Sequence, residues 1–454
     1  MPNKTSLIEE IIGEMIATAA LGPQELAKGD DFGLPRLIPA GTGGSIQITK
    51  GIDDRISNLA SELKAERPEL NKNVRNEEWR SWVRSAIGPL LSRTKLSDPI
   101  EHSAAELLKL LNDQITELIS ALGPAEYSFG TTFLNAAGLA PFSVGPVTFE
   151  SRDLWLARKL SDGTITATMH RRITRAWNGA KLRPRKKNVD DLRERDITDA
   201  VGKSPFVCSV EVDRLSGEAG REIALSAARV GLTCISLIWS ETSQALSGMN
   251  LRIDGGLRHD RILRFVPGKI VLQGSRLRGR PHGPSITPSD WSKVLRDEAA
   301  FFSAAGEVLS YFVSSDENVA RPKLMSTLTQ SLLWFNEGCR ESNDLLGIVD
   351  FAASLDALGG GQKAKAILAV LEARLGVKAT DTIYKGGPTL KSIIDTIYSD
   401  GRSRAIHGTS DKIGHDWTRT RSHAESLARL ALFASLHWAG ANPGAQDEPS
   451  LLKN

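Results

Sequence analysis

Apolar and polar positions along the first part of the chain follow the period of α-helices. In residues 6–19 and again in 104–122, apolar side chains recur three and four positions apart, which places them on one face of a helix. The stretch at 34–47 between them is rich in Gly and Pro and is predicted to be a loop. We therefore predict a helical N-terminal region over residues 1–125.

The pattern changes over residues 126–289. Short runs that are rich in β-branched residues and nearly alternate in polarity predict strands, at 144–150, 163–172, 206–212 and 268–274. One amphipathic helix is predicted among them at 216–237, with Ser216 as its N-cap. The middle of the chain is therefore predicted to be an α+β module.

From residue 290 to 440 the helical period returns, and the connections are short. Successive helices with short loops favour an antiparallel bundle. The remaining residues, 441–454, are predicted to be a flexible tail. The fold class is thus multidomain and mainly α, with a central α+β module and a C-terminal helical bundle. The bundle helices are predicted at 290–313, 324–338, 343–358, 364–375, 389–398 and 417–438.

Composition agrees with a globular protein of several domains. The chain has 454 residues, of which 41% are hydrophobic and 24% charged, and at about 150 residues per domain this length corresponds to about three domains. Lys and Arg number 57 against 54 Asp and Glu, a net charge of only +3. No overall field draws the protein to nucleic acid, so a polyanion site must come from local clustering.

The sequence predicts the cellular compartment through its cysteines, its longest uncharged run and its first twenty residues. Its three cysteines, Cys208, Cys234 and Cys339, are far apart and show no metal or redox spacing, which favours a reducing environment. The longest uncharged run, 127–149, contains Gly, Pro and hydroxyl residues, which argues against a membrane span. The first twenty residues carry acids where a secretory signal has its apolar core. We expect a soluble, cytoplasmic protein.

The most informative chemistry lies in residues 396–408. Arg402 offers a fixed, positively charged fork suited to a phosphate, and His407 can take and return a proton near neutral pH. Five residues along a regular helix turn through about 140°. Either the helix is irregular near Gly401, therefore, or two copies meet across a dimer interface. An arginine at a helix start and a capping histidine without a catalytic role would give the same pattern.

Three ordered motifs resemble the HEPN superfamily, most closely its Apea-like domains. The motifs are Leu332-Leu-Trp-Phe-Asn-Glu-Gly338, Ala353-Ser-Leu-Asp-Ala-Leu358, and the segment from Tyr398 to Gly408 with its Arg-Ser and His-Gly pairs. The resemblance covers about residues 320–440. Asp356 stands where the family more often has Glu, and one extra residue separates Tyr398 from Arg402.

This resemblance implies a four- to five-helix bundle that dimerises, with the two motifs facing one cleft. Such domains are often metal-independent endoribonucleases of phage defence or toxin systems, which leave 2′,3′-cyclic phosphates. Arg402 and His407 match the catalytic pair, Asp356 the acidic position on the second helix, and Ser403 the polar residue after the arginine. With Tyr398, Asp356 is expected to position the pair. The implied partners are RNA such as tRNA, a second copy, and a phage trigger or an antitoxin.

Two other classes stay open. The bundle could be a non-catalytic HEPN scaffold that dimerises and binds a nucleotide or a partner protein, or the chain could be a metal-dependent nuclease. His415 and His423 near the motif have no Cys or Glu at zinc spacing, so we expect neither a metal nor a cofactor.

Two basic clusters in the middle module are hidden by the small net charge. They predict a surface that follows a phosphate backbone, with Trp177 available for stacking. Solvated loops, balanced by the acids that follow at 190–196, would show the same pattern. The residues predicted to bind nucleic acid are Arg171, Arg172, Arg175, Arg183, Arg185, Lys186, Lys187, Arg276, Arg278 and Arg280.

Overall fold

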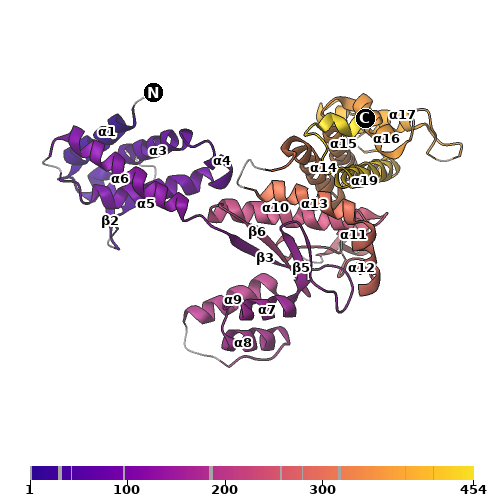
Figure 1. The fold of residues 1–454 in the computed structure, drawn as a ribbon, viewed down its shortest axis with the longest axis horizontal. Helices are drawn as coiled ribbons and strands as arrows, with labels where there is room; N and C mark the ends of the chain where they lie inside the picture. The colour runs from indigo at the N-terminus through magenta and orange to yellow at the C-terminus, as the bar shows by residue number, and fades with distance from the viewer. Residues whose placement is uncertain are drawn as a thin grey trace. The chain divides into compact units, whose positions relative to one another are not determined.

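The structure is a computed structural model, and it forms two compact units (Figure 1). Unit 1 comprises Met1–Ala125 with Val212–Glu222, and unit 2 comprises Glu126–Glu211 with Ile223–Asn454. The fold is mainly helical with small sheets, which confirms the fold class at this level. The residues that the structure describes are 3–28, 33–41, 43–95, 98–183, 188–255, 258–278, 280–314, 319–383, 385–412 and 414–454, without the side chains of 258–265 and 270–278.

Unit 1 is built around the apolar stripes of its helices. Ile8, Ile56, Trp79 and Leu111 are buried in one core, and the Trp79 indole donates to the Ala60 carbonyl at 2.7 Å. Its elements are α1 (Lys4–Thr18), α2 (Pro23–Leu26), β1 (Arg36–Pro39), β2 (Ser45–Ile48), α3 (Lys50–Ala65), α4 (Leu70–Asn73), α5 (Asn76–Leu91) and α6 (Ile100–Ser120).

The loop predicted at 34–47 is wrong, because this stretch forms the antiparallel hairpin β1–β2. Its strands are held by burial of Ile38 and Ile48 in the core. A β-carbon on Gly88 would lie 2.0 Å from the Pro39 carbonyl oxygen, so α5 approaches the hairpin at a glycine. Sequence composition pointed to a loop, but two buried isoleucines decide the structure.

Unit 2 contains a four-stranded sheet in the order β3-β6-β5-β4. Figure 1 shows α10 on one face and three helices, α7 to α9, on the other. A β-carbon on Gly231 of α10 would lie 3.3 Å from Val147 Cγ1 of β5, so helix and sheet pack closely. The elements are β3 (Ala125–Thr131), β4 (Phe142–Val144), β5 (Val147–Ser151), β6 (Phe206–Val212) and α10 (Gly217–Ser236), and β4–β5 and β5–β6 are antiparallel.

The three helices α7 (Arg152–Ser161), α8 (Ala167–Trp177) and α9 (Val189–Val201) form an insertion between β5 and β6. The strand predicted at 163–172 is therefore wrong, because residues 163–166 form a turn and 167–172 belong to α8. Thr166 caps α8 by accepting from the Met169 amide at 3.2 Å, and Met169 and Ile173 are buried one turn apart. The β-branched residues at 164–166 suggested a strand, but they lead into the helix.

A partly buried charge network attaches α7 to the sheet. Glu126 of β3 accepts from Arg158 at 2.9 Å and from Lys159 at 2.8 Å, and Arg158 also donates to Glu150 of β5 at 3.1 Å. Burial by itself raises the pKa of Glu126, but hydrogen bonds from Arg158, Lys159 and Ser128 outweigh it and lower the pKa. The network fixes where the insertion leaves the sheet.

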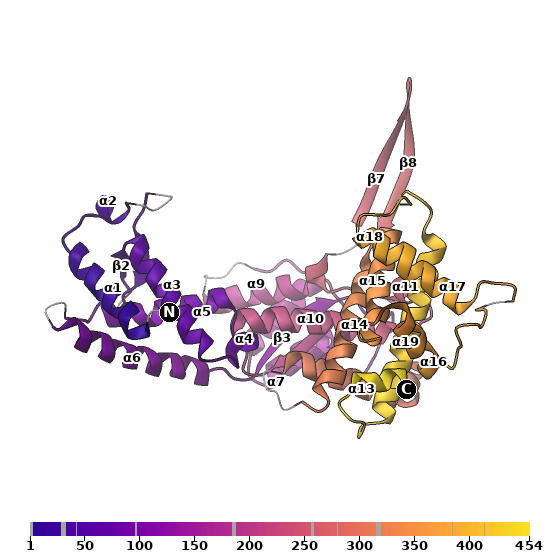
Figure 2. The same cartoon turned by 90° about the horizontal axis from the view of Figure 1, so that it is seen from above.

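The second half of unit 2 is a group of packed helices, preceded by the antiparallel hairpin β7–β8 (Figure 2). The helix predicted at 290–313 is two helices with a break at Glu298, and Trp291 in the first of them packs in an aromatic cluster with Phe142 and Trp239. The elements are α11 (Thr242–Leu246), η1 (Arg252–Asp254), β7 (Arg258–Val266), β8 (Lys269–Arg278), α12 (Pro288–Asp297), α13 (Ala299–Val313), α14 (Pro322–Arg340), α15 (Asp344–Leu358), α16 (Lys363–Leu375), α17 (Leu390–Asp395), η2 (Thr396–Ser403), α18 (Arg404–Ile406), α19 (Thr418–Ala441) and η3 (Pro449–Lys453).

The packing of these helices joins the bundle to the sheet module. Asn336 of α14 donates to Thr233 of α10 at 2.7 Å, and both side chains are buried. At the other end of the bundle, residues 441–454 differ from the flexible tail that we predicted. Leu452 of the 3₁₀-helix η3 is fully buried, and Arg374 of α16 donates to the Leu451 carbonyl at 2.8 Å. The tail is ordered because it supplies an apolar anchor to α16.

Candidate functional site

The segment that carries Arg402 is an irregular helix. After α17 the chain widens into the π-helix η2, and α18 follows for one short turn. Gly401 is buried against α15, where a β-carbon would lie 2.5 Å from Ile348 Cγ2. Of the two geometries left open by the sequence, the structure shows the irregular helix. Such widened turns are frequent at functional sites.

The guanidinium of Arg402 is held from two sides. Its Nη1 donates to the Tyr398 hydroxyl at 2.7 Å, and Nη2 lies 3.3 Å from Asp356 Oδ2 of α15. The guanidinium carbon lies 5.0 Å from the centre of the Tyr398 ring, within cation–π range. Its Nε is buried without an acceptor among the described residues. One N–H group therefore donates to Tyr398 and Nη2 is ion-paired with Asp356, so the remaining Nη hydrogens stay available for an anion.

Asp356 itself is fixed by the backbone that follows its helix. It is only 8% exposed, and its Oδ1 accepts from the Lys363 amide at 3.0 Å. The shorter aspartate side chain still reaches Arg402, because η2 packs directly on α15. The two carboxylate oxygens thus serve different partners, one in the turn and one in the candidate site.

His407 and Ser403 are placed differently from this trio. His407 is the C-cap of α18 and is exposed, and its amide donates to the Ser403 carbonyl at 3.0 Å. Within the described part of the chain, the His407 imidazole has no hydrogen bond or ion pair. The structure therefore brings Asp356, Tyr398 and Arg402 together, and leaves the His407 side chain free for an outside group.

A polar cavity lies beside the candidate site. Its volume is about 400 Å³, and most of its lining comes from the exposed side of α17 and η2. Asp400, which lines it, also lies 3.3 Å from the Lys412 ammonium. Lys412 was missed by the sequence interpretation, because no spacing rule connects it with the motif. The lining residues are Thr389, Lys391, Ser392, Asp395, Thr396, Ser399 and Asp400.

One carboxyl group on α15 has a raised pKa. Burial raises the pKa of Asp350 to about 6, the nearby Glu337 and Glu341 add to the rise, and Arg421 opposes it. The sequence interpretation missed Asp350. The signal that could have suggested an acidic cluster is the pair of glutamates four residues apart, Glu337 on α14 and Glu341 at its C-cap.

The first basic cluster is only partly free. Arg171, Arg175 and Arg183 are exposed, whereas Arg172 is paired with the buried Glu194 at 2.8 Å. Trp177 is not available for stacking as predicted, because it packs against the core of the insertion and Arg152 lies 5.2 Å from its ring centre. Arg185, Lys186 and Lys187 lie outside the described residues.

The second cluster belongs to the hairpin β7–β8. In its register Arg276 pairs with Asp260 and Arg278 with Arg258, which places cations of both strands at the base of the hairpin. Their side chains lie outside the described part of the structure. Arg280 is exposed, and its amide donates to the Ser247 carbonyl at 3.0 Å.

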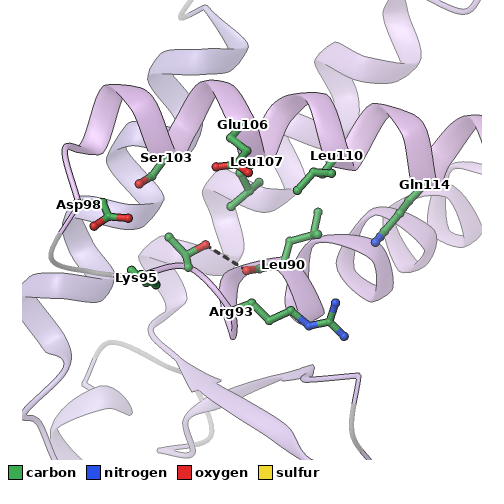
Figure 3. A pocket seen from close by; sticks show the side chains of 10 residues that line it. Leu90, Arg93, Lys95, Asp98, Ser103, Glu106, Leu107, Leu110 and Gln114 are labelled. Atoms are coloured by element: carbon green, nitrogen blue, oxygen red, sulfur yellow. Dashed lines mark hydrogen bonds between the residues drawn. The ribbon is translucent and has the colours of Figure 1, made fainter.

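Unit 1 has a groove of its own between the end of α5 and helix α6 (Figure 3). Its volume is about 460 Å³, with Leu90 and Leu107 as the floor and Arg93, Lys95 and Glu106 at the edges. Its lining includes no histidine or cysteine, so this groove has no group that moves a proton near neutral pH. The Arg402 site is therefore the better candidate for chemistry.

The cysteines do not offer a nucleophile. Burial raises the pKa of Cys234 to about 12 and raises the pKa values of Cys208 and Cys339 as well, which disfavours the reactive thiolate. Among the described residues, no group of three or more His, Cys, Asp or Glu side chains could hold a metal ion. No helix in the described ranges has the length and apolar character needed to cross a membrane.

Comparison with known proteins adds no relative: no protein-family model, curated protein or solved structure matches this chain.

Proposed function

We propose that this protein is a metal-independent endoribonuclease of HEPN type, acting in phage defence or growth arrest. The observation that carries the proposal is the Arg402 guanidinium, which Asp356 and Tyr398 hold in place, together with an exposed His407 five residues further along the chain. A fixed guanidinium can stabilise the charge of a pentacovalent phosphate, and a free imidazole can transfer a proton.

In the proposed reaction the 2′-oxygen of the RNA attacks the adjacent phosphorus. His407 removes the 2′-hydroxyl proton, Arg402 donates to the non-bridging phosphate oxygens, and the bond to the 5′-oxygen breaks. The leaving 5′-oxygen takes a proton from His407 of a second copy. The products are a 2′,3′-cyclic phosphate and a 5′-hydroxyl. The reaction needs neither an oxidant nor a metal-bound water.

A homodimer is part of the proposal. Ile406, next to His407, is 57% exposed, and Leu346 of α15, the helix on which α18 packs, is 50% exposed. We infer that both side chains belong to one interface, since contiguous exposed apolar surface marks sites of protein–protein contact. A second copy over this surface would bring two histidines to one cleft.

A second candidate function follows from the same histidine. Because no described residue orients the His407 imidazole, the alternative is a non-catalytic HEPN bundle that dimerises and binds a nucleotide or a partner protein. In that case Arg402 would bind an anion without cleaving it.

The test is cleavage of total tRNA in EDTA, with analysis of the product ends. We expect cyclic phosphate ends from the wild type, loss of cleavage in His407→Ala with the fold retained, and normal cleavage in the control His415→Ala, another exposed histidine eight residues away. Cleavage by His407→Ala at the wild-type rate would overturn the assignment. Binding without cleavage would support the scaffold, and cleavage only with added metal a metal-dependent nuclease.

A further inference from the structure

The turn between α15 and α16 has an unusual backbone. Gly360 and Gly361 have φ values of +68° and +75°, and Lys363 adopts the left-handed region with φ of +65°. Glycine adopts this region freely, but a lysine needs neighbours that hold it there. Asp356 is such a neighbour, because its carboxylate accepts from the Lys363 amide and its carbonyl accepts from Gly361 at 2.9 Å.

The same carboxylate reaches the candidate site. While Oδ1 binds the turn at 3.0 Å, Oδ2 lies 3.3 Å from Arg402 Nη2. Because both oxygens belong to one planar group on a buried side chain, a movement of the turn changes where Oδ2 points. The geometry of Arg402 therefore depends on a turn that does not itself belong to the site.

The outer side of this turn is held by the segment Pro449–Lys453. The Lys453 ammonium donates to the Gly359 carbonyl at 3.4 Å and to Gln362 Oε1 at 3.2 Å. Leu452, one residue before, is fully buried, and Arg374 of α16 donates to its carbonyl at 3.2 Å. In Figure 1 this segment, drawn in yellow, lies beside α16, against which it packs.

We propose that Lys453, anchored by Leu452, is a positioning residue for the Arg402 guanidinium. The inference rests on the proposed function, since it assumes that Arg402 binds the reacting phosphate. Lys453 fixes the glycine turn, the turn fixes Asp356, and Asp356 orients Arg402. This deepens the proposed function, because it makes cleavage depend on whether Pro449–Lys453 is docked.

The kinetic test compares Lys453→Met with Lys365→Met, which removes an exposed lysine from α16. We expect Lys453→Met to lower kcat about ten- to a hundredfold, because small misplacements of a charged group cost rates of this order, with KM little changed. Lys453→Arg should restore most of the rate, since a guanidinium can donate to the same two oxygens. Leu452→Ala, which loosens the anchor, should lower kcat in the same direction.

A second readout does not need activity. The Nε–H resonance of Arg402 can be followed by NMR and identified by its absence in Arg402→Lys. We expect it to shift or broaden in Lys453→Met, to recover in Lys453→Arg and to stay unchanged in Lys365→Met.

Together, kcat and the Arg402 NMR signal distinguish the positioning role of Lys453 from the nuclease proposal. If the Arg402 signal responds but the wild type cleaves no RNA under any condition tested, the positioning role stands and the nuclease proposal fails. If the wild type cleaves RNA and Lys453→Met changes neither kcat nor the Arg402 signal, the positioning role is overturned.

Discussion

Asp350 on α15 should make the stability of unit 2 depend on pH. Its pKa is raised by burial and by Glu337 and Glu341 from an ordinary value of 3.8 to about 6. A raised pKa means that the folded state favours the protonated form, so the stabilising effect is complete below pH about 4 and is lost as the pH rises through about 6. Replacing the carboxyl by an amide removes a charge that the folded state disfavours.

The size of this effect follows from the shift. A rise from 3.8 to about 6 corresponds to about 3 kcal/mol at about 1.4 kcal/mol per pKa unit. Because Asp350 is only partly buried, solvent screening reduces the expected gain to about 1–2 kcal/mol. Asp350→Asn should therefore raise the free energy of unfolding by this amount at pH 8, and by about a third of it at pH 4.5.

Urea unfolding of the wild type, Asp350→Asn and the control Asp196→Asn at both pH values checks this. Asp196 is an exposed aspartate on α9. A gain of equal size at pH 4.5 and pH 8, or a loss of stability at pH 8, would show that the folded state does not disfavour the charged carboxylate of Asp350.

Two further predictions concern the site and the basic insertion. Gly401→Ala should lower the free energy of unfolding by about 1–3 kcal/mol and reduce tRNA cleavage, because its β-carbon would lie 2.5 Å from Ile348 Cγ2. Thermal unfolding measures the loss, and adding Ile348→Ala to the same chain should recover part of it. If the double variant recovers nothing, the loss does not come from this contact. The double variant Arg171→Glu with Arg175→Glu should weaken tRNA binding and reduce its salt dependence by about one to two phosphate contacts. Filter binding at several salt concentrations checks this, with Arg221→Glu as the control. If the plots of log affinity against log salt have the same slope for the double variant and the wild type, α8 does not belong to the RNA surface.

The helices were predictable where the apolar period was long. Leu324, Leu328 and Leu332 recur at intervals of four on α14 and are buried, so the pattern and the packing agree. The hairpin β1–β2 and helix α8 were not predictable in this way. Gly and Pro hid two buried isoleucines in the first, and β-branched residues imitated a strand in the second.

The candidate site was predictable only in part. Tyr398 and Arg402 lie four residues apart, a spacing at which side chains on a helix meet, so their contact was within reach of a local rule. Lys453 could not be found from the sequence, because it lies 94 residues from the Gly359 carbonyl to which it donates. Such pairs depend on how the whole bundle packs, and no local spacing records them. The resemblance to HEPN domains stays a prediction.

The insertion α7–α9 has a consequence for how this chain can vary. It leaves β5 after Ser151 and returns to β6 at Phe206, and these two residues are direct neighbours across the antiparallel pair. The 3.1 Å hydrogen bond from the Arg152 amide to the Pro205 carbonyl closes its base, and its core consists of its own apolar residues together with Val207 of β6. The insertion therefore connects two paired strand ends, as a loop connects the two strands of a hairpin. Replacing these residues as a unit would leave the register of β5 and β6 in place, provided that the new segment again supplies cations to Glu126 of β3 and Glu150 of β5.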